Sequence, residues 1–341
     1  MCDTVGQTDD SGRFCTIDWS ALARLLVPCR RVLLTTHVRP DCDAIGSSVA
    51  LAAVLEQLGK QVVLVGGFDV PPNYRFLDPE HRFQRIGRDV PDRIVDQVDL
   101  LMILDTSAWA QLGDMAEPFR RSGAKKAVLD HHLSADDLGA EVFRDARAEA
   151  TGRLVVAAAD HLNVPLDTRI ATALFAALAT DTGWFRFCST TAETYRLAAR
   201  LTELGARPDE LYRQLYENES LARLHLVGRA IGRTRTDLQG RLIYTSILRQ
   251  DFEETGALAS DSEDVINLTL AVAGTEVAVI LIEQASGQFK ISFRSRNDLD
   301  CSRVAEQFGG GGHRNAAGAT VPGPREVAEA QVLDAVRAAM R

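Results

Sequence analysis

The first two hundred residues alternate between short apolar segments and longer amphipathic ones. Four apolar segments rich in β-branched residues have the length of buried strands, and they cover residues 30–36, 60–67, 98–107 and 125–132. A helical pattern covers residues 19–26, 44–59, 149–162 and 167–180. Apolar strands separated by helical segments are typical of parallel sheets that are covered on both faces. The pattern therefore predicts an α/β domain with a doubly wound, mostly parallel sheet.

The second half of the chain has a different order of segments. A capping pattern, Thr190-x-x-Glu193, predicts a helix that ends at Gly205, and Pro208 begins a long polar helix that reaches about Gly232. Strands are then expected over 241–248, 276–284 and 288–295, and helices over 301–308 and from about residue 324. The expected organisation is a polar lead-in (1–15), a first domain (16–190), a helical connector (191–235) and a smaller α/β domain (236–341).

Composition and charge narrow the class of protein. The 341 residues are 46% hydrophobic and 25% charged, which suits a globular protein of about two domains. The net charge of −9 argues against a partner held along a long phosphate backbone, so no long duplex nucleic acid is expected. No apolar run reaches the ~18 residues of a membrane span, the N-terminus has no signal-peptide pattern, and the cysteines form no Cys-x-x-Cys pair. We expect a cytoplasmic protein with reduced thiols and no membrane partner.

Histidines and aspartates gather at the ends of the predicted strands and helices. The set has two imidazoles and four carboxylates: His37, Asp41, Asp43, Asp105, His131 and Asp181. Each residue alone would more often cap a helix or hold a turn. Four carboxylates at one sheet edge, however, would repel one another unless cations neutralised them, and two divalent ions would do so. Oxygen-rich ligation with some imidazole suits two Mn²⁺ ions, with Mg²⁺, Co²⁺ or iron as weaker alternatives.

The six residues belong to a series of five separated motifs that together resemble a known family. They are His37-x-x-x-Asp41-x-Asp43, Asp105, Asp130-His131-His132, Asp181-Thr182-Gly183 and a C-terminal Gly-Gly-Gly-Gly-His followed by Ala316-Ala317-Gly318. In this order they resemble the DHH phosphoesterase superfamily with its DHH-associated domain, and the layout is most similar to the bifunctional oligoribonuclease and pAp phosphatase (nanoRNase) family. The resemblance implies a manganese-dependent hydrolase of very short RNA and of 3′-phosphoadenosine 5′-phosphate (pAp).

The same resemblance implies roles for individual residues. One metal ion would bind His37, Asp41 and Asp105, and the other Asp43, Asp105, His131 and Asp181, with Asp105 as the bridge. His132 would contact the scissile phosphate, and Asp130 would orient a neighbouring side chain. Cys42, where the family most often has glycine, and Trp184, where a polar residue is expected, depart from the family pattern. If position 42 needs a positive φ, cysteine is slightly unfavourable there.

The glycine-rich segment near the C-terminus is weak evidence by itself, because a flexible linker has the same composition. With a helix before it and His313 after it, it is better explained as a backbone surface that a phosphate or base can approach closely. Arg294-Ser295 resembles the family's clamp for a substrate phosphate, to which the planar guanidinium is suited. The expected substrate-binding residues are Arg294, Ser295, Gly310, Gly311, Gly312 and His313.

The favoured hypothesis is a two-domain phosphoesterase for short single-stranded RNA and pAp, in which a metal-activated hydroxide attacks phosphorus. The alternatives within the superfamily are a phosphodiesterase for pApA or cyclic-di-AMP, a RecJ-type exonuclease, which normally carries extra nucleic-acid-binding domains, and a family II pyrophosphatase, which has a different C-terminal domain. A nucleotide-binding module that has lost catalysis would lack a metal ligand, and none is missing from the motifs. The resemblance also implies a homodimer.

Overall fold

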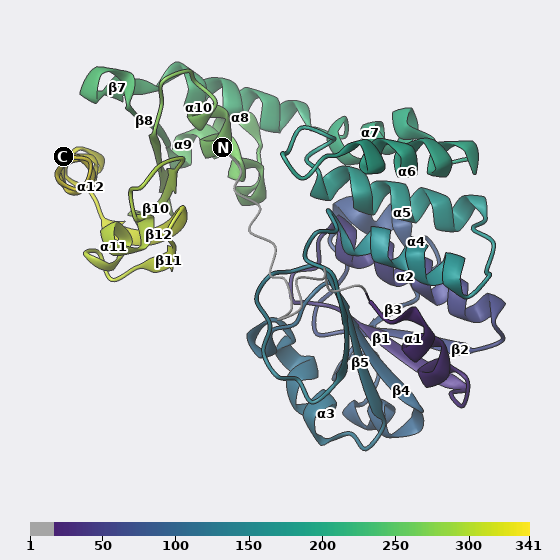
Figure 1. Ribbon diagram of the computed structural model, residues 1–341. Helices are drawn as coiled ribbons and strands as arrows, with labels where there is room; N and C mark the ends of the chain where they lie inside the picture. Colours follow the sequence, from purple (N-terminus) through teal and green to yellow (C-terminus); the bar gives the residue numbers. More distant parts are fainter. Residues whose placement is uncertain (1–16) are drawn as a thin grey trace. The chain divides into compact units, whose positions relative to one another are not determined.

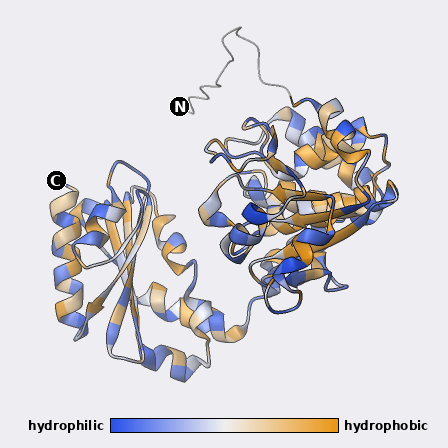
Figure 2. Ribbon diagram, turned by 90° about the horizontal axis from the view of Figure 1, so that it is seen from below, coloured by the Kyte–Doolittle hydropathy of each residue, from blue (hydrophilic) through white to orange (hydrophobic). Residues whose placement is uncertain are grey.

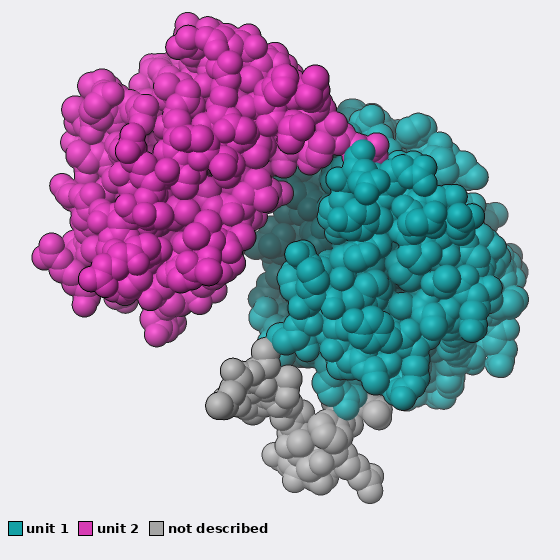
Figure 3. Space-filling model, turned by 90° about the horizontal axis from the view of Figure 1, so that it is seen from above, with its two compact units in different colours: residues 1–217 teal, residues 218–341 magenta. Residues whose placement is uncertain are grey.

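The computed structural model describes residues 17–341, so the lead-in predicted for residues 1–15 lies outside the described part. The chain divides into two compact units, residues 1–217 and 218–341 (Figure 3). The division falls inside the segment that the sequence predicts as a helical connector. Each unit contains its own six-stranded sheet and its own hydrophobic core.

The N-terminal unit is built on a six-stranded parallel sheet, which confirms the predicted α/β fold (Figure 1). Its strands are β1 (Arg31–Thr35), β2 (Gln61–Gly66), β3 (Phe83–Arg85), β4 (Leu100–Leu104), β5 (Lys125–Asp130) and β6 (Glu141–Arg144). The order β3-β2-β1-β4-β5-β6 places β1 beside β4, so the direction in which the chain adds strands reverses between them. In open α/β sheets, ligands bind beyond the carboxyl ends of the strands at this switch point.

Helices and short 3-10 turns cover both faces of the sheet, as its apolar strands require. One face carries α1 (Trp19–Leu26), α2 (Cys42–Gln57), α4 (Thr151–His161) and α5 (Thr168–Asp181), with α6 (Ala192–Glu203) and α7 (Pro208–Tyr216) beyond them. The other face carries α3 (Ala116–Arg121) and the turns η2 (Asp92–Gln97), η3 (Trp109–Gln111) and η4 (Gly113–Met115). Leu100 and Met102 of β4 pack on the first face, and Leu101 and Ile103 on the second. This alternation explains why β4 is apolar at every position.

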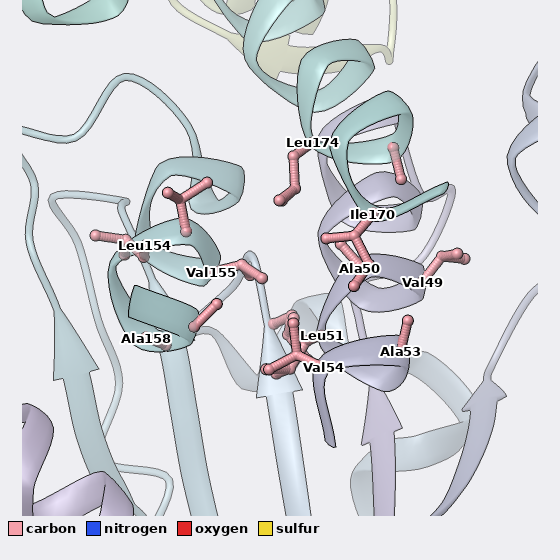
Figure 4. Packing of buried hydrophobic residues seen from close by; sticks show 14 of the residues in the cluster. Val49, Ala50, Leu51, Ala53, Val54, Leu154, Val155, Ala158, Ile170 and Leu174 are labelled. Carbon is pink, nitrogen blue, oxygen red and sulfur yellow. The ribbon is translucent and has the colours of Figure 1, made fainter. Parts of the chain in front are cut away.

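Helices α2, α4 and α5 pack closely because small side chains line their contacts. Figure 4 shows Ala50 and Val54 of α2 among apolar side chains of α4 and α5, including Leu154 and Leu174. At Gly46, an added Cβ would lie 2.6 Å from the carbonyl oxygen of Ala173. The approach of α2 to α5 therefore requires glycine here. This packing fixes the N-terminal turn of α2, which carries two of the predicted ligands.

The structure differs from the sequence prediction in two edge strands, one helix start and one long helix. The sequence pattern did not predict β3 and β6, which have only three and four residues and lie at the sheet edges. The N-cap of α6 is Thr191, and its capping box closes with Thr194, one residue beyond the predicted Thr190-x-x-Glu193 box. The single long helix predicted from Pro208 is two helices, α7 and α8 (Leu221–Gly232), because the side chain of Ser220 caps a new helix.

The C-terminal unit has a mixed sheet between two layers of helices. Its strands are β7 (Arg235–Asp237), β8 (Leu242–Ile247), β9 (Val277–Glu283), β10 (Gln288–Ser295), β11 (Gly311–His313) and β12 (Ala316–Pro322), in the order β11-β12-β10-β9-β8-β7. Strands β8 and β9 are parallel, and the other pairs are antiparallel. One face carries α8, α9 (Arg249–Thr255) and α10 (Val265–Leu270), and the other carries α11 (Cys301–Glu306) and α12 (Arg325–Ala339). Figure 2 shows hydrophobic residues concentrated on the strands of each unit.

Two further findings concern the class of protein. No helix among residues 17–341 has both the length and the apolar character needed to cross a bilayer. The four cysteines of the described part, Cys29, Cys42, Cys188 and Cys301, form no disulfide with one another.

Candidate metal centre

Three neighbouring strands bring polar side chains to one edge of the N-terminal sheet. His37 follows β1, Asp105 comes directly after β4, and Asp130 is the last residue of β5, with His131 and His132 next in the chain. Because these strands are adjacent and parallel, their carboxyl ends meet at the switch point of the sheet.

Two helix ends add the remaining carboxylates. Asp41 is the N-cap of α2 and accepts a hydrogen bond from the backbone N–H of Ala44 (3.0 Å), and Asp43 lies in the first turn of the same helix. Asp181 is the last residue of α5. The structure thus brings together all six residues that the sequence singled out as metal ligands.

The ligand atoms form two separate groups of three residues, and a third group, Asp105, His131 and His132, overlaps both. His37, Asp41 and Asp105 make one group, Asp43, His131 and Asp181 make the other, and within each group the atoms lie within 4.8 Å of one another. Asp105 connects them, because its two oxygens lie 3.4 Å from Nε2 of His37 and 3.4 Å from Nε2 of His131. Nε2 of His131 is also 3.3 Å from an oxygen of Asp181. The arrangement has the donor set of a metal site, with the Asp105 carboxylate between the two histidines.

Backbone carbonyls fix which nitrogen of each histidine faces the group. Nδ1 of His37 is 2.9 Å from the carbonyl oxygen of Val38, and Nδ1 of His131 is 3.1 Å from that of Ala148. A carbonyl oxygen only accepts hydrogen bonds, so Nδ1 carries a proton in both rings, whether Nε2 is protonated or not. Nε2 therefore points at the carboxylates in both cases, which is the usual arrangement of a metal-binding histidine.

The buried Asp43 carboxylate caps a helix other than its own. The N-cap residue of α4, Ala150, has no side chain able to accept a hydrogen bond. The backbone N–H groups of Thr151 and Gly152 instead donate to the two oxygens of Asp43 (2.7 and 3.0 Å), and the Ser47 hydroxyl donates to one of them as well (2.7 Å). The N-terminus of α4 thus favours the charged form of Asp43 and holds its orientation.

Thr151 joins the two groups of ligands. Its hydroxyl donates to the Asp105 carboxylate (2.9 Å), while its backbone N–H donates to Asp43. Sequence reasoning did not single out Thr151 or Ser47, because a threonine at a helix start and a serine within a helix are common and carry no chemical signal. Their roles depend on how α4 packs against α2, which local sequence does not encode.

Without bound cations, the carboxylates of this group repel one another. Burial, together with the Asp105 and Asp181 carboxylates, raises the pKa of Asp43 well above its ordinary value, and burial raises the pKa of Asp181 to about 6. Burial opposes the positive charge on the histidines, but hydrogen bonds to Asp105 and the nearby carboxylates outweigh it and raise the pKa of His37 to about 9 and that of His131 to about 10. The group therefore has an excess of negative charge in a buried place, and bound cations would relieve it. Imidazole and carboxylate donors of this kind make a metal site.

His132 is held beside the candidate metal centre by a separate pair of hydrogen bonds. Its Nδ1 lies 2.8 Å from Asp130, and its backbone N–H donates to the same oxygen (3.1 Å). The Ser107 hydroxyl donates to the other oxygen of Asp130, which is completely buried. Because a carboxylate holds Nδ1–H, Nε2 of this half-exposed ring is left to face a ligand.

Cys42 and Trp184, the two expected departures from the family pattern, differ in backbone conformation. Cys42 is the first residue of α2 and is buried in the core, and φ at this position is not positive. The expected conformational cost of cysteine at this position is therefore absent. Trp184 follows the Asp181-Thr182-Gly183 turn at φ 57° and is partly buried against the core.

In the C-terminal unit, the predicted substrate-binding residues lie on neighbouring strands. His313 of β11, Ala316 of β12 and Arg294 of β10 stand directly opposite one another, so their side chains project from the same face. Ser295 is the next residue along β10 and therefore faces the other side, where its hydroxyl is 2.9 Å from the side-chain oxygen of Asn297.

The glycine run forms an edge strand. Gly311 and Gly312 pair with β12, and an added Cβ at Gly310 would lie 2.2 Å from the carbonyl oxygen of Gly318. At Gly312, where φ is 150°, the corresponding distance to the Ala316 carbonyl oxygen is 2.6 Å. The run is therefore a close-packed strand, not a flexible linker.

Comparison with known proteins gives an independent line of evidence. The profile of the DHH family, N-terminal domain, matches residues 31–178, and that of the DHHA1 domain matches residues 239–341. The bifunctional oligoribonuclease and PAP phosphatase NrnA of Thermus thermophilus is 33% identical over 311 residues, which cover 90% of this chain and 89% of that protein. The corresponding protein of Bacillus subtilis is 27% identical over 296 residues, which cover 85% of this chain and 89% of that protein. The crystal structure of an exopolyphosphatase-related protein from Bacteroides fragilis has the same fold, with a TM-score of 0.80 at 24% identity and 94% of each chain covered.

Proposed function

Because this chain belongs to the DHH phosphoesterase family and carries a DHHA1 domain, we propose that it hydrolyses short single-stranded oligoribonucleotides to mononucleotides and removes the 3′-phosphate of pAp. The observation that carries the proposal is the group of six histidine and aspartate side chains at the switch point of the N-terminal sheet. The relative from Thermus thermophilus, named as an oligoribonuclease and PAP phosphatase, supports the substrate class.

The proposed cofactor is a pair of Mn²⁺ ions. We assign His37, Asp41 and Asp105 to one ion, and Asp43, Asp105, His131 and Asp181 to the other. When bound, such ions neutralise the carboxylates, polarise a phosphoryl oxygen and lower the pKa of water. The protein's own contribution is to hold the ligands: the carbonyls behind His37 and His131 and the N-terminus of α4 behind Asp43 fix them before a substrate arrives.

His132 is the residue that we assign to the scissile phosphate. Its hydrogen bond to Asp130 raises the pKa of His132, which favours the doubly protonated ring. Nε2–H would then donate to a non-bridging phosphoryl oxygen and stabilise the negative charge that these oxygens carry in the transition state. Asp130 orients the ring from a buried position and does not touch the substrate.

A second phosphate of the substrate would bind to the C-terminal unit. The guanidinium of Arg294 and the ring of His313 project from one face of the sheet, beside glycine backbone that a ligand can approach closely. We propose that these residues, with Gly310, Gly311 and Gly312, bind the substrate's remaining phosphate. Ser295 supports the turn after β10 through Asn297.

The direct test uses the full chain with Mn²⁺ on di- to pentanucleotides and on pAp. Asp105→Asn is the informative variant, because Asp105 has a φ of 63° that asparagine also tolerates, so the substitution removes the charge without backbone strain. Asp114→Asn, on an exposed residue of the same unit, is the matched control. We expect turnover by the wild type and by Asp114→Asn, and a loss of at least about 100-fold in Asp105→Asn. Equal rates in all three proteins, or no turnover in any, would refute the proposal.

Related substrates distinguish the neighbouring activities. Turnover of pApA or cyclic-di-AMP above that of pAp would identify a dinucleotide phosphodiesterase built on the same site. Tight nucleotide binding without Mn²⁺ binding would identify a non-catalytic module. The homodimer that the family resemblance implies stays a prediction.

A further inference from the structure

An aromatic surface lies on the catalytic side of the N-terminal unit and has no role in the chemistry described so far. Three of the five tyrosines of the chain belong to it or border it: Tyr74, Tyr212 and Tyr216. At its centre is Trp184, whose ring contacts those of Tyr212 and Tyr216 edge to face, with centroids 5.1 and 5.6 Å apart.

This surface adjoins the candidate metal centre through the chain itself. Trp184 follows the ligand Asp181 by three residues, and the intervening turn is closed by the backbone N–H of Trp184 donating to the carbonyl of Ala179 (2.6 Å). Tyr74 lies in the turn η1 (Pro72–Leu77), which packs against both α2 and α7. This turn therefore links α2, whose first turn carries Asp43, to α7, which carries Tyr212 and Tyr216.

The backbone at Trp184 is held in a conformation that bulky residues rarely adopt. Trp184 and Phe185 both have positive φ values, 57° and 64°. Such strain persists only where the surroundings impose it, and it concentrates at ligand-binding sites. Here the buried Thr182 imposes it, since its hydroxyl and carbonyl accept the backbone N–H groups of Phe185 (3.1 Å) and Arg186 (3.0 Å).

Ordinary core packing accounts for only part of the surface. Phe175 and Phe185 contact Trp184 from the core side, whereas Tyr212 and Tyr216 remain 41% and 44% exposed. The Arg186 side chain, two residues after Trp184, donates from Nε to the carbonyl of Gly183 (2.7 Å). Exposed aromatic rings beside an arginine, next to a phosphoesterase centre, suit the flat, uncharged part of a nucleotide.

We propose that Trp184, Tyr212 and Tyr216 form a stacking subsite for the nucleobase of the nucleotide whose phosphate lies at the metal centre. This inference rests on the proposed function. It explains how the N-terminal unit would distinguish a nucleotide from other phosphate esters. Stacking needs only a π-face, so the subsite accepts all four bases and favours purines, whose larger rings stack more strongly.

The test compares two ligands that differ only in the base. 5′-AMP and ribose 5-phosphate are titrated into the Mn²⁺-loaded full chain by calorimetry, and the affinity ratio is measured in the wild type, in Tyr212→Leu/Tyr216→Leu and in Tyr195→Leu. Tyr195 is the matched control, because it is an exposed tyrosine of the same unit that stacks on Phe185 and not on Trp184. We expect the wild type and Tyr195→Leu to bind AMP at least about 10-fold more tightly than ribose 5-phosphate, and the double variant to lose most of that ratio.

Two outcomes would refute the subsite. One is a wild-type ratio of AMP to ribose 5-phosphate affinity near one, which would result if another part of the protein or a second copy covered the rings. The other is an unchanged ratio in the double variant. If the double variant does not fold, tryptophan fluorescence of the wild type tests the subsite instead. AMP should quench this fluorescence and ribose 5-phosphate should not, and Trp184→Phe should remove the quenching. A chain that hydrolyses pAp but does not prefer AMP over ribose 5-phosphate refutes the subsite alone. A chain that shows the preference but hydrolyses nothing refutes the proposed function alone.

Discussion

Replacing Thr151 by valine should weaken metal binding more than it weakens the fold. The substitution keeps the shape of the side chain and the backbone N–H that donates to Asp43, and it removes only the hydroxyl that donates to Asp105 (2.9 Å). A hydrogen bond to a charged group contributes about 1.5 to 3 kcal/mol. If that energy serves to orient the Asp105 carboxylate toward both cation sites, the Mn²⁺ dissociation constant rises by roughly 10- to 100-fold, the range typical of residues behind a metal ligand.

Calorimetric titration of Mn²⁺ into the metal-free protein measures this effect, and urea unfolding of the same metal-free protein measures the fold. Thr151→Ser keeps the hydroxyl and should restore most of the affinity. Thr172→Val is a matched control, because the Thr172 hydroxyl donates to a backbone carbonyl on the outer surface of α5. An unchanged or tighter dissociation constant in Thr151→Val, with only a loss of unfolding free energy, would show that Thr151 supports the fold and does not position the ligand.

Three further predictions follow from the same structure. His37 and His131, with pKa values of about 9 and 10, are protonated at pH 7 in the metal-free protein. Since metal binds only the neutral rings, Mn²⁺ binding should release protons from both rings and weaken as the pH falls, and a calorimetric enthalpy that is independent of the buffer would contradict this. Gly310→Ala should lower the unfolding temperature of the C-terminal unit, because its Cβ would meet the backbone of β12, whereas Gly311→Ala, with open space around the added Cβ, should not; scanning calorimetry distinguishes them. The Cys42 thiol, 1% exposed and with its pKa raised by burial, should resist maleimide in the folded protein and react only on unfolding, as peptide mapping by mass spectrometry would show.

The ligand set could be predicted from the sequence because residues that follow neighbouring parallel strands lie at the same edge of the sheet. Each of β1, β4 and β5 is an apolar run that stops at a polar residue, and neighbouring parallel strands must end at the same edge. His37, Asp105 and His131 could therefore be grouped from the sequence without knowing any contact between them.

The residues behind the ligands were not predictable in this way. Thr151 acts on Asp105 only because the N-terminus of α4 lies against α2, and that contact depends on packing between segments more than one hundred residues apart. The same limit applies to Ser107, which holds Asp130 across two strands.

Short edge strands escaped prediction for a different reason. β3 and β6 have too few residues to show a period, and β11 consists largely of glycine, which has no strand preference of its own. Pairing with neighbouring strands forms these elements. The local sequence therefore does not predict these strands. It also does not predict the strand pairing that places His313 and Arg294 on the same face of the sheet.

The central claim is that the six side chains bind two cations that hydrolysis requires, and a stoichiometric titration tests it most directly. Metal-free protein receives Mn²⁺ stepwise, and bound ions and orthophosphate release from pAp are measured in the same samples. We expect two ions per chain in the wild type, full activity only after the second ion has bound, and fewer than two ions in Asp105→Asn. Two ions in Asp105→Asn, or full activity with one ion or none, would contradict it.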